Sequence, residues 1–336
     1  MTNSSKLTTR LGAGPEVSRI ALGCMGMSGM YGDADEAESI ATIHASLERG
    51  VTLLDTGDFY GTGANELLIG RALRGRRDQA LLSVKFGILR GPDGSFLGAD
   101  CRPVAVKNAL AHTLTRLGVD HVDIYRPSRL DPAVPIEDTI GAVADLVKAG
   151  YVRAIGLSEV GPDTIRRAQA VHPISDLQIE YSLISRGPED KIFPLLAELG
   201  IAVTAYGVLS RGLLTGSRPA GPRDFRAHLP RFTGENRERN QRLVAALEQL
   251  AAARGVRPAQ LAIAWVLARS RATPRLPTIV PVIGARTRKQ LDESLGALAI
   301  ELSASEIAAI EQAVPASEVA GDRYQTQQMQ HLDSER

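Results

Sequence analysis

The chain has 336 residues, of which 44% are hydrophobic and 23% charged, and its formal net charge is +1. This is the composition of a globular protein, and the near-neutral charge argues against nucleic acid or an anionic membrane as the main partner. The start, MTNSSKLTTR, lacks the apolar run of a signal peptide, and no stretch approaches the ~18 consecutive apolar residues of a membrane span. Two cysteines, Cys24 and Cys101, make no disulfide framework and fit a reducing compartment, so we expect a cytoplasmic protein. A single Cys24–Cys101 bridge is the less favoured alternative.

The elements follow one another in a regular alternation. Residues 7–20 alternate around a Gly-Pro turn and predict a hairpin. Short runs rich in Val, Ile and Leu then predict strands at residues 19–24, 52–57, 81–87, 122–127, 152–158, 177–182, 202–209 and 278–284. Amphipathic patterns between them predict helices, among them 36–50, 103–118 and 137–150, each ending in the Gly that helix C-termini favour.

This alternation predicts the fold class. Apolar strands bounded by helices imply a parallel sheet covered on both faces, and eight strands are the number that closes a barrel. An open doubly wound sheet is the alternative, but no GxGxxG follows the first strand. We therefore predict a (β/α)8 TIM barrel with an N-terminal hairpin and a C-terminal tail, forming one domain over residues 1–336. The stretches 88–101 and 217–235 are expected to be loops at the ligand face.

Chemistry in such a barrel lies at the carboxyl ends of the strands, and polar residues stand there in this sequence. They are Asp55, Lys85, Ser128, Ser158, Glu159, Gln178, Tyr206 and Arg286, and Gly284 stands at the end of the eighth strand. Asp55 and Lys85 lie inside apolar strands, where a lone charge is costly and a pair is the usual remedy. One interpretation is an ion pair that only joins two strands.

The other interpretation adds Tyr60, which follows Asp55 in a glycine-rich turn. A phenol with a pKa of about 10 is a poor acid near neutrality, but an adjacent ammonium stabilises the phenolate. Such a Tyr can donate a proton to a carbonyl oxygen that receives a hydride.

The stretch LDTGDFYGTGANELLIGRAL resembles the D-T-A-x-x-Y-G-x-x-x-N-E-x-x-(L/I)-G signature of the aldo-keto reductases. The likeness continues through LGCMGMS, SVKFG, RLDP, GLSE, LQIEYSLISR, GLLTG and VIGARTRKQLDESLGAL, and GDRY in the tail is similar to bacterial and plant members. The resemblance implies a (β/α)8 barrel that binds an extended nicotinamide dinucleotide without a Rossmann fold.

It also implies a role for individual residues. Tyr60 becomes the general acid, tuned by the buried pair of Asp55 and Lys85. Ser158 and Gln178 hold the nicotinamide carboxamide, and Tyr206 stacks on its ring. Taken alone, Gln178 would be read as a solvated strand end and Tyr206 as a core aromatic. Glu159 stands where the family usually has Asn.

The rest of the cofactor site is implied in the same way. The residues that the resemblance assigns to it are Gly23 and Met25 in the first motif, Leu209, Ser210 and Arg211 along the pyrophosphate, and Gly284, Arg286, Gln290, Glu293 and Ser294 at the adenosine end. A glycine and a helix start suit an anion at that end. Arg286 is the expected partner of a 2′-phosphate, which favours NADPH. A solvated helix-cap arginine is the alternative, and Arg288 and Lys289 are nearby candidates for the same role.

The sequence departs from the family at position 128. The family has a His in an H-R-x-D-P stretch, and here Ser128 stands in that place. His121 precedes the strand, and seven residues at ~3.3 Å each put it roughly 23 Å away. No His pair has metal-ligand spacing. Strand parity puts Arg126 on the face of Ser128, so we expect either a cation near the site or a buried pair with Glu159.

We therefore predict an NADPH-dependent oxidoreductase that reduces an aldehyde or ketone to an alcohol, with Ser128 as a small neutral donor. The alternative is a nucleotide-sensing barrel with little turnover, like the potassium-channel β-subunits. A sugar- or phosphate-binding barrel unrelated to redox chemistry does not account for the motifs together. The partner is a small-molecule carbonyl; its identity and the oligomeric state are not legible in the sequence.

Overall fold

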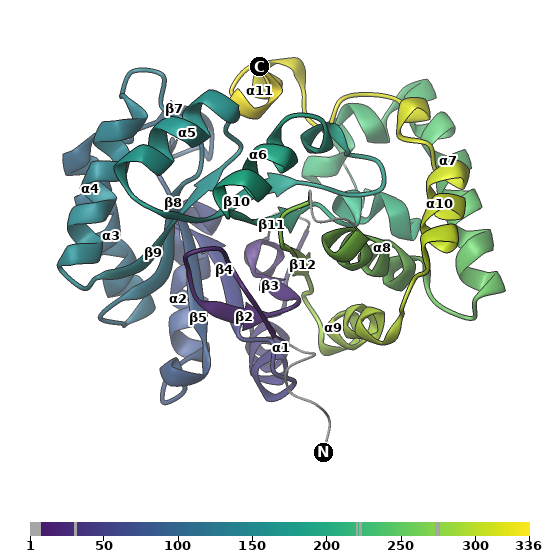
Figure 1. Cartoon of the computed structure of the whole chain (residues 1–336). Helices are drawn as coiled ribbons and strands as arrows, with labels where there is room; N and C mark the ends of the chain where they lie inside the picture. The colour runs from purple at the N-terminus through teal and green to yellow at the C-terminus, as the bar shows by residue number, and fades with distance from the viewer. Residues whose placement is uncertain (1–7, 30–31, 220, 222–223, 273–275) are drawn as a thin grey trace.

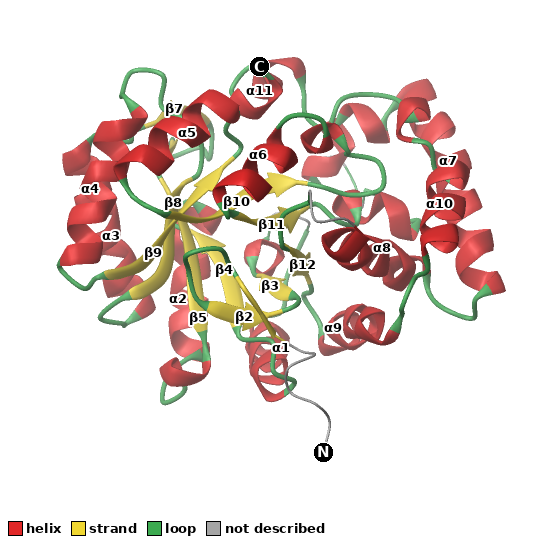
Figure 2. Ribbon diagram, in the orientation of Figure 1, coloured by secondary structure: helices red, strands yellow, loops and turns green. Residues whose placement is uncertain are grey.

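The computed structural model describes residues 8–29, 32–219, 221, 224–272 and 276–336. Eight parallel strands close into a barrel in the order β3-β4-β5-β8-β9-β10-β11-β12, and helices surround it (Figures 1 and 2). The barrel strands are β3 (Ala21–Gly23), β4 (Leu53–Gly57), β5 (Leu81–Phe86), β8 (Val122–Pro127), β9 (Val152–Ser158), β10 (Ile174–Glu180), β11 (Ala202–Tyr206) and β12 (Ile279–Gly284). All eight predicted strands are present, so the (β/α)8 barrel is confirmed and the open sheet is wrong.

Strand ends differ from the prediction where the backbone turns. β11 stops at Tyr206 and not at 209, because Gly207 and Ser210 take positive φ angles of 67° and 46°. β10 begins at Ile174, earlier than predicted, because Ile174 already pairs with Ile155 of β9.

Most of the helices form the outer layer of the barrel, and the last one lies in the C-terminal tail (Figure 2). They are α1 (Glu36–Glu48), α2 (Ala64–Ala72), α3 (Pro103–Leu117), α4 (Ile136–Lys148), α5 (Pro162–Val171), α6 (Ile192–Leu199), α7 (Gly234–Ala253), α8 (Pro258–Ala272), α9 (Arg288–Leu295), α10 (Ala304–Ala313) and α11 (Thr326–Met329). α3 shows why the sequence predicts the helix ends: Pro103 occupies the first turn, and Gly118 ends the helix in the left-handed region at φ 67°. Within the described part of the chain, none of the helices has the length and apolar character of a membrane span.

The predicted hairpin lies at the amino end of the barrel. β1 (Thr8–Arg10) pairs antiparallel with β2 (Glu16–Ser18), as expected for the described part of residues 7–20. Leu11 and Val17 are buried in a small apolar cluster with inward-facing strand residues such as Leu53. The hairpin therefore closes the bottom of the barrel, which leaves the carboxyl ends of the strands as the open face.

Both segments expected to be loops contain regular structure. Residues 88–101 hold an antiparallel hairpin of β6 (Ile88–Arg90) and β7 (Phe96–Ala99), so the loop prediction is wrong there. The Pro-Asp-Gly turn between two apolar runs was a signal for this hairpin. In 217–235, residues 220 and 222–223 lie outside the described residues, and the remainder contains the 3-10 turns η7 (Phe225–His228) and η8 (Pro230–Phe232).

Candidate active site

Three predicted site residues meet inside the barrel near its carboxyl end. The Lys85 Nζ lies 2.6 Å from Asp55 Oδ2, and the Gln178 Nε2 donates to Asp55 Oδ1 at 2.8 Å. Asp55 is 5% exposed and Lys85 3% exposed. Alternation along each strand causes this, because Leu54 before Asp55 and Val84 before Lys85 face outward into the core. The predicted Asp55–Lys85 pairing is confirmed.

Burial and charge act against each other at Lys85. Burial lowers the pKa of its ammonium, and the Asp55 carboxylate opposes that change. Asp55 also accepts a hydrogen bond from Ser83 Oγ at 3.0 Å, so its two oxygens are held by three side chains from β5 and β10. The carboxylate therefore keeps a cation in a buried position beside the open face.

Tyr60 lies next to this pair. It begins the 3-10 turn η3 (Tyr60–Gly63), in which Gly61 and Thr62 both take left-handed angles, with φ of 55° and 51°. The Lys85 Nζ is 5.0 Å from the centroid of the Tyr60 ring, and the Phe59 ring packs edge-on against it at 4.7 Å. Tyr60 is 7% exposed, so its phenol lies within the site and not on the outer surface.

Asn65, which the sequence analysis does not assign to the site, lies in α2 just after the turn that carries Tyr60. Asn65 is fully buried; its Oδ1 accepts from Thr56 Oγ1 at 2.6 Å, and its Nδ2 donates to the Cys24 carbonyl at 2.8 Å. Asn65 thus joins β4 to the segment after β3. Its place in the N-E pair of the signature was the available signal.

Ser128 follows β8 at the same rim. Its backbone N–H donates to the Phe86 carbonyl at 2.8 Å, which continues the pairing with β5, and the residue is 2% exposed. Ser128 thus lies one strand from Lys85. His121 lies before β8, with its Nδ1 2.6 Å from Asp120, at the opposite end of the strand, as predicted.

Arg126 lies near the site, as one expectation had it, and bonds to Ser83, the neighbour of Asp55, but the expected pair with Glu159 is wrong. Its fully buried guanidinium pairs with Asp176 at 2.6 Å and not with Glu159, and it also donates to Thr204 at 3.1 Å. Gly156 leaves the room for it, because a Cβ there would lie 2.9 Å from the Arg126 Cζ. Arg126 therefore sits one layer below the site, between it and the apolar bottom of the barrel.

The nicotinamide-end candidates come from three neighbouring strands. Ser158 is opposite Gln178 in the β9–β10 register, and Tyr206 is opposite Glu180 in the β10–β11 register. The Tyr206 hydroxyl donates to Glu159 Oε1 at 2.7 Å. Burial, and then the Glu159 carboxylate, raise the pKa of Tyr206, which keeps this phenol a neutral donor.

The pyrophosphate candidates form a strained turn after β11. Ser210 and Arg211 have φ of 46° and 56°, angles that non-glycine residues rarely adopt. Among the described residues, the buried Ser210 Oγ has no hydrogen-bond partner. The Arg211 guanidinium donates to Glu180 at 2.9 Å. The strained backbone and the orphaned hydroxyl fit a polar ligand that supplies the missing bond.

The first motif and β12 place two glycines at the same rim. Gly23 pairs with Gly284 of β12 on one side and with Asp55 of β4 on the other. Gly284 is exposed, and a Cβ there would meet only the Gly23 carbonyl, at 4.0 Å. Met25 begins the next turn, η2 (Met25–Ser28). The backbone at Gly284 is therefore open, beside Gly23 and one strand away from Asp55.

The adenosine-end candidates lie on α9 and just before it. The Arg286 N–H donates to Gln290 Oε1 at 2.9 Å, and the Arg286 Nη1 donates to the Asp33 carbonyl at 3.3 Å. Glu293 lies 3.7 Å from Arg257, and the Ser294 hydroxyl bonds back to the helix at the Gln290 carbonyl.

The two other cations nearby differ from Arg286 in their surroundings. Arg288 is held by Glu38 at 2.8 Å, and its side chain is on the exposed side of α9. Lys289 is exposed.

Cys24 and Cys101 are both buried free thiols, so no bridge forms.

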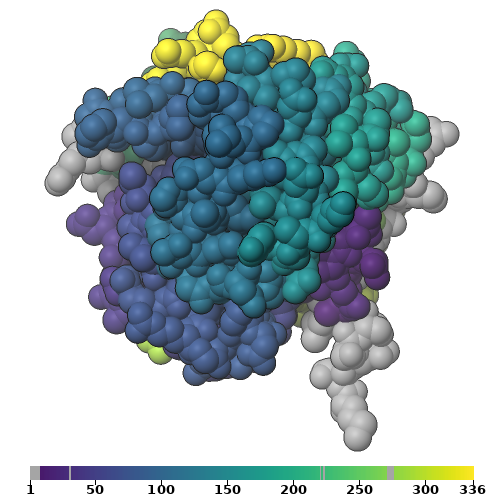
Figure 3. Space-filling view, turned by 90° about the vertical axis from the view of Figure 1, so that its left-hand side faces the viewer, coloured from purple at the N-terminus to yellow at the C-terminus, as the bar shows by residue number. Residues whose placement is uncertain are grey.

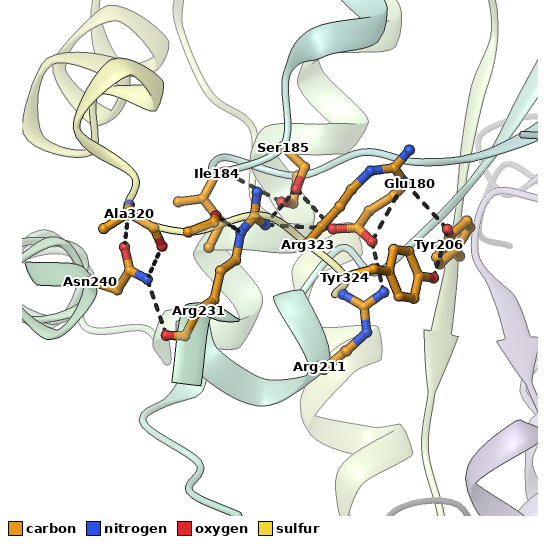
Figure 4. Close-up of polar contacts among 12 residues, drawn as sticks. Glu180, Ile184, Ser185, Tyr206, Arg211, Arg231, Asn240, Ala320, Arg323 and Tyr324 are labelled. Carbon is orange, nitrogen blue, oxygen red and sulfur yellow. Dashed lines mark hydrogen bonds and ion pairs between the residues drawn. The ribbon is translucent and has the colours of Figure 1, made fainter. Parts of the chain in front are cut away.

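Two further residues at this rim come from the C-terminal tail. Arg323 Nη2 lies 2.6 Å from Glu159 Oε2. The Tyr324 hydroxyl lies 3.0 Å from the Tyr206 hydroxyl (Figure 4). The GDRY motif was noticed in the sequence, but nothing in it indicated a place beside Tyr206.

Comparisons with known proteins place the chain in a family. The profile of the Aldo/keto reductase family matches residues 19–315. The chain is 42% identical to a probable aldo-keto reductase 1 of Glycine max, over 96% of this chain and 93% of that protein. It is 38% identical to the aldo-keto reductase yakc [NADP(+)] of Schizosaccharomyces pombe, over 95% of this chain and 94% of that protein.

Solved structures give the same result. The glycerol dehydrogenase AKR11B4 from Gluconobacter oxydans has a TM-score of 0.83 and 27% identity, covering 95% of this chain and 98% of its own. An aldo/keto reductase from Klebsiella pneumoniae in complex with NADP and acetate has a TM-score of 0.71 and 25% identity, covering 95% and 98%. With the barrel, the Asp55–Lys85 pair and the matched profile together, the chain belongs to the aldo/keto reductase family.

Proposed function

We propose that this protein reduces an aldehyde or ketone to an alcohol with NADPH, using Tyr60 as the proton donor. The observation that carries the proposal is the buried Asp55–Lys85 pair, at 2.6 Å, with its ammonium 5.0 Å from the Tyr60 ring centre. A purely structural ion pair between β4 and β5 would not require a phenol held over it by a strained turn.

NADPH is the proposed cofactor because the names of similar proteins and structures include NADP or NADPH. The yakc relative carries NADP(+) in its name, and two Klebsiella pneumoniae structures contain NADP or NADPH. In this chain the orphaned Ser210 hydroxyl, the open rim at Gly284 and the helix start of α9 fit such a ligand. Ser158, Gln178 and Tyr206 are assigned to its nicotinamide end, and Arg286 to the 2′-phosphate.

The chemistry divides between the cofactor and the chain. When bound, NADPH supplies a hydride for the carbonyl carbon. Tyr60 then donates its proton to the carbonyl oxygen, and the Lys85 ammonium stabilises the phenolate that remains. Asp55 holds Lys85 in place, and its carboxylate opposes the burial that lowers the pKa of Lys85. Ser128 contributes a short hydroxyl where a longer imidazole donor is usual.

The direct test is NADPH oxidation with a panel of small and bulky aldehydes and ketones. Turnover that depends on the carbonyl supports the reductase. Tight NADPH binding with no turnover on any carbonyl would instead support a nucleotide-sensing barrel.

We predict that the protein binds NADPH more tightly than NADH and that Arg286→Ala removes this preference. A charge-assisted bond to a phosphate contributes about 1.5–3 kcal/mol, so the NADPH dissociation constant should rise about tenfold or more. NADH affinity should stay unchanged. Arg288→Ala is the matched control, because Glu38 already holds that guanidinium at 2.8 Å. Equal affinities of the wild type for the two cofactors would contradict the role.

We predict that Ser128→His raises kcat/KM for small reactive aldehydes, because a directional donor then reaches the substrate oxygen. Arg126 does not occupy that space, since its guanidinium points down to Asp176. Wild type should prefer bulky or already reactive carbonyls over plain ketones. The check is kcat/KM for both proteins across the panel, with NADPH affinity as control. Loss of activity on every carbonyl at unchanged NADPH affinity would mean that the site is built around the serine.

A further inference from the structure

The C-terminal tail, residues 320–336, lies across the carboxyl ends of the strands and is anchored at both ends. Figure 3 shows it (yellow) along the top of the molecule. At its start, Asn240 of α7 makes two 2.9 Å hydrogen bonds with the backbone of Ala320 (Figure 4). Near its end, Asp333 Oδ2 accepts from the Gly161 N–H and the Thr164 hydroxyl, both at 2.8 Å.

Between these anchors the tail inserts a cation into the rim. Arg323 is 7% exposed and makes a bidentate contact with Glu159, at 2.8 Å from Nη1 and 2.6 Å from Nη2. Glu159 is fully buried and also accepts from the Ser334 hydroxyl at 2.6 Å. Burial raises the pKa of Glu159, but Arg323 outweighs it and the pKa falls to about 2. The carboxylate is therefore charged at neutral pH and bound to the tail.

The same carboxylate holds the ring assigned to the nicotinamide. Glu159 Oε1 accepts from the Tyr206 hydroxyl at 2.7 Å, and the Tyr324 hydroxyl lies 3.0 Å from the same Tyr206 oxygen. Glu159 has a φ of 53°, and its backbone N–H is fixed to the Gln178 carbonyl at 3.0 Å, so its direction is set at both ends. Glu159 Oε1 thus accepts hydrogen bonds from both Arg323 of the tail and the Tyr206 hydroxyl.

We propose that Arg323 is a positioning residue: through Glu159 it fixes the Tyr206 ring in the orientation that stacks on the nicotinamide. This inference rests on the proposed function, since it needs a nicotinamide at Tyr206. Glu159, in the position of the usual Asn, serves as the link and does not itself face the carboxamide. A ring ordered before binding lowers the entropy cost of stacking, so Arg323 should contribute to affinity for the nicotinamide half alone.

The alternative is a purely structural role, in which Arg323 only holds the C-terminal tail on the rim of the barrel. The two interpretations differ in which part of the cofactor binds more weakly when Arg323 is lost. A displaced or damaged tail would disturb binding generally or not at all, whereas a misaligned Tyr206 ring affects only ligands that carry nicotinamide.

The experiment compares NADPH with adenosine 2′,5′-bisphosphate, which has the 2′-phosphate but no nicotinamide. For Arg323→Met we expect the NADPH dissociation constant to rise about tenfold, equivalent to ~1.4 kcal/mol. Binding of the bisphosphate should stay at the wild-type level, and Arg323→Lys should recover a large part of the NADPH affinity. Arg336→Met is the matched control, because that guanidinium donates to the Gln330 carbonyl within the tail.

A second variant keeps the test decisive if Arg323→Met does not fold. Tyr206→Phe retains the ring and removes the hydroxyl that Glu159 holds, so it should also weaken NADPH and spare the bisphosphate. Where both fold, the double variant should lose little more than either single one.

Several outcomes overturn the inference. These are wild-type NADPH affinity in Arg323→Met or in Tyr206→Phe, equal losses of NADPH and bisphosphate, or fully additive effects in the double variant. Failure of the proposed function looks different: the wild type itself then binds no NADPH, or binds it and reduces no carbonyl. Absence of wild-type NADPH binding overturns both.

Discussion

Tyr60→Phe is expected to lower the rate of carbonyl reduction ~10²–10⁴-fold, the usual effect of removing a general acid, while NADPH binding stays near normal. The phenylalanine keeps the ring that packs edge-on against Phe59 at 4.7 Å and removes only the hydroxyl. The turn, the Asp55–Lys85 pair and the residues assigned to the cofactor should therefore be unchanged. The measurement is the single-turnover rate at saturating NADPH, so that cofactor release does not mask the chemical step.

Tyr151→Phe provides the control, because Tyr151 is 49% exposed, directly before β9 and away from the site. It should have wild-type rates. A Tyr60→Phe protein that keeps more than half of the wild-type single-turnover rate would show that the proton comes from elsewhere. Ser128 or a bound water would then be the next candidates.

The second large effect is on stability and concerns the layer beneath the site. Arg126→Met should lower the free energy of unfolding by roughly 3–5 kcal/mol, because it leaves Asp176 as a buried charge without its cation. Both side chains are fully buried, and the Thr204 hydroxyl cannot neutralise the carboxylate. Equilibrium denaturation in guanidinium chloride measures the change.

The double variant Arg126→Met/Asp176→Asn should recover much of this loss, since no charge then remains buried at nearly constant volume. Arg153→Met is the matched control on β9, where the side chain is exposed, and should change stability by less than about 0.5 kcal/mol. If Arg126→Met is as stable as this control, the buried pair contributes far less than its geometry indicates.

Arg126 also reaches the site through one hydroxyl. Its Nη2 donates to Ser83 Oγ at 3.0 Å, and Ser83 donates to Asp55 at 3.0 Å. The polar layer therefore supports the carboxylate that holds Lys85, and its charge adds to the forces that lower the pKa of Lys85. Loss of Arg126 should consequently weaken the positioning of Asp55 as well as the barrel.

The sequence by itself determined the barrel and the centre of the candidate site. Apolar runs and helical periods report local structure, and eight such units leave few ways to cover both faces of a parallel sheet. Alternation along a strand is equally local, so it placed Asp55 and Lys85 on the inner face. A lone buried charge is costly, which made each the obvious partner of the other.

Only the tertiary structure decided which of the remaining charges pair. Parity placed Arg126 on the inner face, but its partner, Asp176, is 50 residues away across the barrel interior. Glu159 pairs with Arg323, 164 residues later in the chain, because the C-terminal tail lies across the rim of the barrel. Such pairs depend on the stagger of the strands and the path of the tail, and both are set by packing of the whole chain. The face of a side chain is a local property, whereas its partner depends on the closed fold.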